Sequence, residues 1–386
     1  MKRIYMDNGA TSYPKAPGVA DAMSRFITDV GCNVGRGAYA EAFEAQRLIW
    51  ELREMLCGLF DGPDPKNVIF TMNITQSMNM LLKGVLKSGD HVLISPMEHN
   101  AVLRPIHQLT AEGISYDLLP ADSVGRLVTT EFESYIKPNT KAIICTHASN
   151  VCGTINPLEK VGEFAKANKL WFIVDAAQTA GVIPISMKNI QADAIAFTGH
   201  KGLLGPQGVG GFVLTQQLSD EMTSLITGGT GSHSESEIQP EFLPDKFESG
   251  TPNTVGLYGL HAAIKYVLSE GMDQIFAHEL SVTERFISGI QKLDGVRLIG
   301  EPTMENRTAV VSLDFEKLDN AEVSYLLEKH YAIATRVGMH CAPLAHKHLN
   351  TFPKGTVRFS FSYFNTNEEI DQAIEAVQTL LNEVEE

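Results

Sequence analysis

The sequence predicts an α/β fold, with a large domain on a mostly parallel sheet between helices and a smaller C-terminal α+β domain. Two observations predict it. In the first two thirds of the 386 residues, short apolar runs alternate with helical stretches. In the last third, helices come first and strands follow. Short runs that are apolar on both sides are typical of parallel strands buried between helices.

The elements of the larger part follow one another in the order expected for such a sheet. Each strand run is short and rich in Val, Ile or Phe, which favours a strand over a helix. The expected strands are 67–71, 91–95, 142–146, 171–175, 194–198 and 209–214, and the expected helices include 40–60, 76–86, 101–109 and 157–167.

The last third predicts a separate small sheet. Helices are expected over 255–293, and strands over 308–315, 332–336 and 356–362. A capping-box pattern, Thr366 with Glu369, starts a final helix. Its apolar face is predicted to be Ile370, Ile374, Val377, Leu381 and Val384. We therefore divide the chain into 12–254 and 255–386, and leave open whether residues 1–11 return to the small domain.

Composition excludes several classes of function. Lys and Arg number 31 and Asp and Glu 46, a net charge of −15, and no basic run occurs, so nucleic acid and anionic membranes are not expected partners. No stretch approaches the roughly 20 apolar residues of a membrane span. Five cysteines without a CxxC pair, and an N-terminus without an apolar signal core, favour a reducing, cytoplasmic location.

Two residues that end successive strands are candidates for chemistry. Asp175 follows an apolar run, and as a simple structural residue it would cap a helix. Lys201 follows the next run within Gly199–Gly202, and most lysines in loops are merely exposed. Because both strand ends face one crevice, a second interpretation is a desolvated amine that forms a Schiff base, with a carboxylate as its cofactor's counter-ion.

That pairing is what pyridoxal phosphate needs, together with ligands for its phosphate. Thr75 precedes a helix whose N-terminal amides could bind an anion, and Thr198 and His200 flank the lysine. His99 follows another strand and could lie over the cofactor ring, although a single histidine is more often structural. The glycine-rich run 202–211 is not a nucleotide loop, because it leads into a strand instead of opening a helix.

At this point the sequence resembles the cysteine desulfurase and selenocysteine lyase family, in particular its SufS-like group, which belongs to the class-V aminotransferases of pyridoxal phosphate fold type I. The similarity covers nearly the whole chain. The motifs that carry it are 5–11 (YMDNGAT), 33–37 (NVGRG), 98–99 (EH), 149–154 (SNVCGT), 174–178 (VDAAQ), 199–201 (GHK), 248–253 (ESGTPN), 336–342 (RVGMHCA) and 357–358 (VR).

The resemblance implies a role for each matched residue. The cofactor would be bound by Thr75, Gln76, His99, Asp175, Gln178, Thr198, His200, Lys201 and Thr251, with Thr251 reaching over from a second subunit of a homodimer. The substrate would be bound by Asn150, Arg336 and Arg358. The catalytic residues would be Lys201, His99 and Cys341.

Cys341 is the residue that would make this a sulfur enzyme. A cysteine is most often a small buried apolar residue, and we assign that interpretation to Cys57 and Cys145. Cys341 instead has Arg336 and three histidines (His340, His346 and His348) nearby, which could favour its thiolate. Metal binding by that Cys/His group is a further reading, without paired spacing to support it.

The resulting hypothesis is conversion of L-cysteine to L-alanine with a persulfide on Cys341. Selenocysteine lyase and cysteine sulfinate desulfinase activities are the alternatives, because Met339 replaces a histidine of the group's pattern. More distant alternatives are an aminotransferase and a non-catalytic scaffold. A sulfur-acceptor protein is a possible partner, and the polar, glycine-rich segment 228–242 is either a surface loop or a gate near the site.

Overall fold

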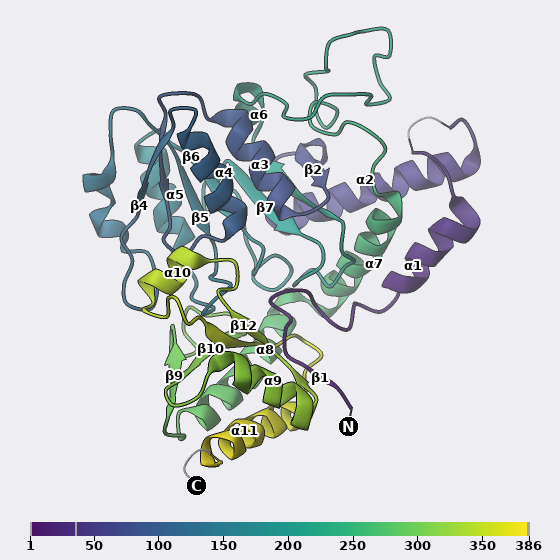
Figure 1. The fold of residues 1–386 in the computed structure, drawn as a ribbon. Helices are drawn as coiled ribbons and strands as arrows, with labels where there is room; N and C mark the ends of the chain where they lie inside the picture. Colours follow the sequence, from purple (N-terminus) through teal and green to yellow (C-terminus); the bar gives the residue numbers. More distant parts are fainter. Residues whose placement is uncertain (1, 35–36, 384–386) are drawn as a thin grey trace.

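The computed structural model describes residues 2–34 and 37–383 (Figure 1). Its strands are β1 (Ile4–Tyr5), β2 (Val68–Thr71), β3 (His91–Ile94), β4 (Ser115–Leu118), β5 (Thr140–Thr146), β6 (Trp171–Asp175), β7 (Ala194–Thr198), β8 (Gly210–Leu214), β9 (Val296–Ile299), β10 (Val310–Phe315), β11 (Ile333–Ala334), β12 (Arg336–Gly338) and β13 (Thr356–Ser360).

Its α-helices are α1 (Val19–Arg25), α2 (Ala40–Phe60), α3 (Ile74–Val85), α4 (Asn100–Thr110), α5 (Leu158–Ala167), α6 (Gln216–Glu221), α7 (Thr254–Glu270), α8 (Met272–Ile290), α9 (Asn320–Tyr331), α10 (Pro343–His348) and α11 (Asn367–Asn382). A π-helical turn covers Phe26–Val30, and 3-10 turns cover Pro65–Asn67 and Thr129–Tyr135.

The larger sheet has seven strands in the order β2-β8-β7-β6-β5-β3-β4. Strands β4, β3, β5, β6 and β7 run parallel, and β8 is antiparallel to both of its neighbours. This is the mostly parallel α/β sheet that the sequence predicts. The carboxyl ends of β3, β5, β6 and β7 consequently lie along one edge, where ligands bind in open α/β sheets.

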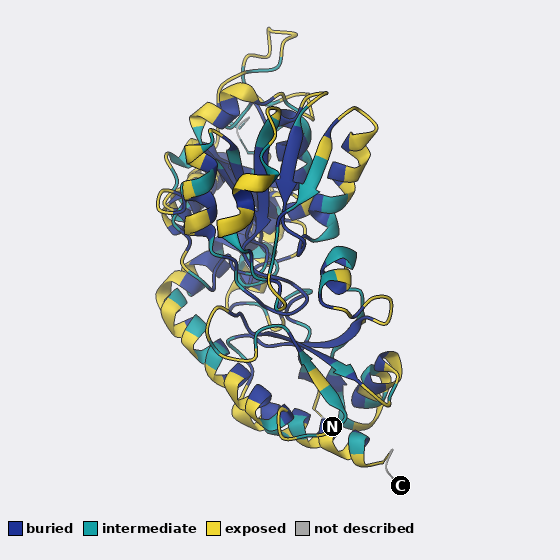
Figure 2. Ribbon diagram, turned by 90° about the vertical axis from the view of Figure 1, so that its left-hand side faces the viewer, coloured by how far each residue is buried: buried dark blue, intermediate teal, exposed yellow. Residues whose placement is uncertain are grey.

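Helices cover both faces of this sheet, which is why its strands are apolar throughout. One core cluster joins the sheet to α2, α5 and α7, and the other joins it to α3, α4 and α6. Figure 2 shows the central strands as a buried layer between helices whose outer faces are exposed. Leu257, Leu260 and Ile264 of α7 belong to the first cluster, so α7 packs on the large sheet although it follows residue 255. The domain division at 255 stays a prediction.

The smaller sheet has four strands, ordered β12-β13-β10-β9 and antiparallel throughout. It packs on α8, α9 and α11 in a separate core cluster. The capping box at Thr366 and Glu369 is present, and Ile370 and Val377 are buried as the pattern predicts; Val384 lies outside the described residues. At the N-terminus, β1 pairs in parallel with β11, and Ile4 packs in the same core.

The structure differs from the expected elements mainly at the edges of the sheets and where one expected element is divided into two. Strands β4 and β9 are edge strands with mixed burial, so they lack the two-sided apolar run that identifies the central strands. The predicted strand 332–336 is two short strands, β11 and β12. The helical stretch after residue 255 is two helices, separated at Gly271, which has φ 86°.

Two other features bear on function. Within the described residues, no helix has both the length and the apolar character needed to cross a membrane. Between α6 and α7 the chain forms no helix or strand over 222–253, and part of it projects from the large domain in both views (Figures 1 and 2). The segment 228–242 belongs to this loop.

Candidate active site

The ends of β6 and β7 bring the predicted counter-ion and the predicted amine together. Asp175 is the last residue of β6 and pairs with Ala196 of β7, two residues before that strand ends at Thr198. Lys201 follows directly, within a turn whose amide and carbonyl groups bond to each other. No helix begins after Asp175; its Oδ1 accepts from the main-chain N of Ala177 at 2.8 Å instead. The helix-cap interpretation of Asp175 is therefore wrong.

Burial sets the charge state of both groups. It lowers the pKa of Lys201 to about 8, although Asp175 acts in the opposite direction. Burial also raises the pKa of Asp175, while Ala177 N–H and Lys201 lower it. Asp175 is 3% exposed, so a cationic ring nitrogen beside it would be strongly favoured. Lys201 in turn keeps a substantial neutral, nucleophilic fraction near neutral pH.

A set of groups suited to a phosphate lies at the same end of the sheet. Within the described residues, Thr198 Oγ1 and His200 Nδ1 are buried without a hydrogen-bond partner. Thr198 pairs with Gly210 of β8. Gly210 lies so close to Asn73 that a Cβ atom added to the glycine would be 3.1 Å from Asn73 Cα. Asn73 caps α3, so this close approach brings the helix N-terminus beside Thr198. Unpaired buried groups that can donate a hydrogen bond, beside a helix N-terminus, are what a phosphate needs.

The other predicted phosphate residues lie in the first turn of α3. Thr75 is exposed there. Gln76 Oε1 accepts from Met72 N at 2.7 Å, and Gln76 N donates to Asn73 Oδ1 at 3.0 Å. Gln76 and the exposed Thr251 line one groove of about 890 Å³ on the large domain, together with Phe43 and Trp50.

His99 has a structural role as well as a place in the crevice. It is the N-cap of α4, and its Nδ1 accepts from Ala101 N at 3.0 Å. Nδ1 therefore carries a lone pair, and the proton of the neutral ring is on Nε2. Burial, followed by the charges of Lys201, Arg336 and Arg358, lowers the pKa of His99 to about 4. The ring thus lies among the three predicted cationic residues and is neutral.

Arg358 is the buried guanidinium of the site. It is 1% exposed on β13, where it pairs across the sheet with Arg336 of β12. Its Nη1 donates to the main-chain oxygen of Asn150 at 3.0 Å, and its Nη2 donates to Asp7 Oδ1 at 2.7 Å. Arg358 Nε and Asn150 Oδ1 are buried and unpaired within the described chain. One donor of Arg358 and one acceptor of Asn150 are thus left without a partner in two residues that are bonded to each other through Nη1 and a main-chain oxygen.

Cys341 lies between β12 and α10, and it is the exposed member of five free cysteines, the other four being buried. Its main-chain oxygen accepts from Asn100 N at 2.7 Å, which places the loop against the residue after His99. This loop, 339–342, is called the cysteine loop below. Residues 2–34 and 37–383 contain no group of three His, Cys, Asp or Glu arranged to hold a metal ion.

The histidines near Cys341 do not act as predicted. His340 and His346 are buried, and burial lowers their pKa values to about 2 and about 4. Both are therefore neutral near pH 7 and cannot stabilise a thiolate by positive charge. The Nε2 atom of His348 lies 2.7 Å from the main-chain oxygen of Asp122, to which it is hydrogen-bonded. For His340 and His346, the expectation of a cationic histidine fails because desolvation disfavours the charged imidazole.

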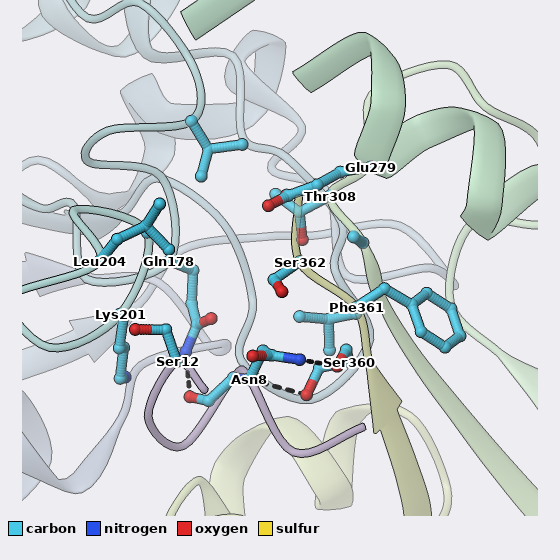
Figure 3. Close-up of a pocket in the computed structure, with 15 residues that line it drawn as sticks. Asn8, Ser12, Gln178, Lys201, Leu204, Glu279, Thr308, Ser360, Phe361 and Ser362 are labelled. Atoms are coloured by element: carbon cyan, nitrogen blue, oxygen red, sulfur yellow. Dashed lines mark hydrogen bonds between the residues drawn. The ribbon is translucent and has the colours of Figure 1, made fainter. Parts of the chain in front are cut away.

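The N-terminal segment wraps the lysine turn. Lys15 Nζ and Ser12 N both donate to the main-chain oxygen of His200, at 3.1 and 2.8 Å. Gln178 Nε2 donates to Gly9 O at 3.1 Å. In Figure 3, Ser12, Gln178 and Lys201 line one side of a narrow cavity of about 40 Å³, and Glu279 and Thr308 line the other. The N-terminal segment 8–15 therefore lines the cavity between the lysine turn and the end of β13.

Comparison with known proteins shows the family of this chain. The sequence profile described as aminotransferase class-V matches residues 4–373. The chain belongs to the class-V aminotransferase family. A probable cysteine desulfurase of Methanothermobacter thermautotrophicus is 32% identical over 98% of this chain and 94% of its own length. A cysteine desulfurase of Haloferax volcanii is 30% identical over 97% and 88%.

Solved structures of the family agree with the fold. The apo structure of a cysteine desulfurase from Thermococcus onnurineus has a TM-score of 0.92 and 31% identity, covering 99% of this chain and 95% of that one. The cysteine desulfurase CsdA of Escherichia coli has a TM-score of 0.89 and 28% identity, covering 98% and 95%. The predicted family and the fold-type-I architecture are confirmed.

Three charged residues of the site have no role in the expectations drawn from the sequence. Asp7, Lys15 and Glu98 lie at 2.6–3.2 Å from the groups they contact. Glu98 is fully buried, accepts from Ser95 Oγ and Thr146 N at 2.6 Å, and has a pKa that burial raises to about 8. Asp7 and Glu98 belong to the motifs 5–11 and 98–99. A charged residue in an apolar setting is the sequence signal that could have identified them. Gly35 and Arg36 of motif 33–37 lie outside the described residues.

Proposed function

We propose that this chain is a pyridoxal phosphate-dependent cysteine desulfurase that converts L-cysteine to L-alanine and leaves the sulfur on Cys341. The observation that carries the proposal is the position of the one exposed cysteine. Its loop is bonded to Asn100 beside His99, in the crevice that also holds Lys201 and Arg358. The names of the relatives agree with it.

The residues present fit the cofactor. Lys201 would carry it, Asp175 would face its ring nitrogen, and the unpaired Thr198 Oγ1 and His200 Nδ1 would receive its phosphate. Gln178, Thr75 and Gln76 complete the proposed set. When bound, pyridoxal phosphate supplies a ring that accepts electrons from the substrate's Cα. The remaining chemistry belongs to side chains of this protein.

Those side chains have separable tasks. Arg358 binds the substrate carboxylate, since a guanidinium pairs with a carboxylate through two donors. Neutral Lys201 removes the Cα proton and, as the ammonium it then is, returns a proton to carbon, while His99 donates a hydrogen bond from Nε2–H to the substrate sulfur. Cys341 attacks the substrate sulfur as a thiolate. The S–S bond forms as the C–S bond breaks, and carbon receives a proton, so L-cysteine and one thiol give L-alanine and one persulfide without an external oxidant.

A second copy of the chain is part of the proposal. The groove that holds Gln76 and Thr251 is also lined by Phe43, Trp50 and Ile226, all more than 40% exposed in the single chain. Apolar side chains of this size, gathered in one groove, are typical of an interface. A homodimer that covers the groove would bring Thr251 to the partner's cofactor. A sulfur-acceptor protein would then remove the persulfide, and loop 228–242 could contact it.

The test is a product assay on the protein reconstituted with pyridoxal phosphate. Wild type should form alanine from L-cysteine, and a persulfide should appear on Cys341 by mass spectrometry. Cys341→Ser should lower alanine formation more than a hundredfold and should show no persulfide at position 341. Cys57→Ser is the matched control, because that thiol donates to Gly62 O and a hydroxyl can replace it.

The same assay separates the alternatives. Undiminished turnover of selenocysteine or cysteine sulfinate by Cys341→Ser, without cysteine turnover, would assign the lyase or desulfinase activity. A keto acid in place of alanine would assign transamination. A protein that stays colourless with pyridoxal phosphate would be a scaffold, and the proposal would fail.

A further inference from the structure

The main chain at the nucleophile adopts a conformation that side-chain-bearing residues rarely take. His340 and Cys341 have φ values of 46° and 57°. Two successive residues other than glycine in the left-handed region are energetically unfavourable, and such a turn persists only where its surroundings hold it. The cysteine loop must therefore have anchors, and the structure shows where they are.

One anchor is the side chain of Asn150. Its Nδ2 donates to the main-chain oxygen of His340 at 2.7 Å, in a bond that is buried from solvent. Asn150 is 8% exposed, and its own main-chain oxygen is held by Arg358 Nη1 at 3.0 Å. The asparagine thus joins the proposed carboxylate-binding arginine to the peptide group that precedes Cys341.

The second anchor is the ring of His340. Ser312 Oγ donates to Val151 O at 2.6 Å and lies 2.9 Å from Thr356 Oγ1, which lies 3.0 Å from His340 Nε2. Each hydroxyl has one hydrogen. Ser312 must accept from Thr356, and Thr356 must accept from Nε2–H of His340. The chain of bonds runs in one direction, and it fixes the neutral ring of His340 below the loop.

The bond of Asn150 changes what this residue can offer a substrate. Because Nδ2 is used by His340, the atom left unpaired is the carbonyl oxygen Oδ1, which is buried. An oxygen acceptor repels a carboxylate. A carboxylate could gain a bond from Asn150 only if Nδ2 released the cysteine loop, so the carboxylate role implied by the family resemblance competes with the contact seen here.

We propose that Asn150 is a positioning residue for Cys341, whose side-chain amide holds the turn that carries the nucleophile. The inference rests on the proposed function, since it gives Cys341 the role of nucleophile. The turn itself, however, can be measured directly and without catalysis. Asn100 N–H bonds to Cys341 O at 2.7 Å, and Ala342 N–H bonds to Met339 O at 2.9 Å, so both amides report whether the loop is held.

The experiment is residue-resolved hydrogen–deuterium exchange on the full chain, as purified. Asn150→Asp, which keeps the shape and loses the donor, and Asn150→Ser should each speed exchange of the Asn100 and Ala342 amides by tenfold or more. Thr356→Val, which removes the other anchor and leaves Arg358 untouched, should do the same. Asn168→Ala is the matched control: its amide also bonds a main-chain oxygen, Phe164 O at 3.1 Å, but at the end of α5.

Two results would overturn the inference. One is exchange within twofold of wild type at both amides in folded Asn150→Asp and Asn150→Ser. The other is equal acceleration in Asn168→Ala, which would mean general destabilisation. In the reconstituted enzyme, Thr356→Val should lower kcat about tenfold with KM within twofold. If wild type makes no alanine, the proposed function fails, and the exchange rates still decide whether Asn150 holds the loop.

Discussion

Arg358 and Asp7 form an ion pair in the centre of the site, with Nη2 of the arginine 2.7 Å from Oδ1 of the aspartate. The arginine side chain is 2% exposed and the aspartate side chain 21%. The buried cation therefore has a carboxylate partner before any substrate arrives. That partner comes from the N-terminal segment, 351 residues away in sequence. Substrate binding must share or displace it.

Replacing Asp7 should expose this competition. Asp7→Asn leaves a buried guanidinium without a counter-ion, which we expect to cost about 2 kcal/mol of unfolding free energy. A substrate carboxylate would then supply the missing charge, so KM for L-cysteine should fall severalfold. Urea unfolding and steady-state kinetics measure the two effects. Asp21→Asn, on the exposed face of α1, is the control; equal behaviour of the two variants would contradict the prediction.

The reactivity of Lys201 should follow its lowered pKa. A lysine with its ordinary pKa of 10.5 is almost fully protonated at pH 8, whereas Lys201, with a pKa of about 8, is about half neutral. Only the neutral amine attacks an aldehyde. The rate of borohydride-trapped coupling to pyridoxal phosphate should rise from pH 6.5 and level off above about pH 8.5. A rate still rising steeply at pH 10 would show an ordinary lysine.

The two roles of His99 can be separated by substitution. Asparagine is a good N-cap, so His99→Asn should keep α4 stable, whereas His99→Ala should lose about 1 kcal/mol. Both remove the ring, and both should lower alanine formation by about a hundredfold or more. Chemical denaturation and the product assay give the two readouts. Full activity in His99→Asn would assign His99 a capping role alone.

Glu279 should make stability depend on pH. It is 7% exposed on α8, and burial raises its pKa from 4.5 to about 8. The folded state thus keeps a proton that the unfolded chain releases, and the stability this provides is complete below pH 4.5 and lost as the pH rises to about 8. Glu279→Gln should therefore be near neutral at pH 5 and stabilising at pH 8.5, by an amount on the order of 3 kcal/mol.

Urea unfolding at the two pH values measures this difference. Glu284→Gln, on the exposed side of the same helix, should show no such dependence. A Glu279→Gln effect that is equal at pH 5 and pH 8.5 would mean that the carboxyl group is ionised in the folded protein.

Sequence reasoning placed the central strands well, because a strand buried on both faces must be apolar along its whole length. It therefore located Asp175, Thr198 and Lys201 at strand ends. The sequence did not predict strands β4 and β9, because an edge strand with one solvated side carries no such pattern. His340 and His346 were misjudged for a related reason: proximity to Cys341 in sequence says nothing about burial, and burial keeps these two rings neutral.

By itself, the sequence determined the family and the α/β architecture, and it proposed Lys201, Asp175 and Cys341 as functional residues, because these depend on local pattern and residue chemistry. Only the tertiary structure decided which groups meet. Asp7 reaches Arg358, Asn150 reaches the carbonyl before Cys341, and Asn100 reaches Cys341 itself. Each contact joins segments far apart in the chain, and each depends on desolvation and hydrogen-bond direction, which exist only once the two sheets have packed together.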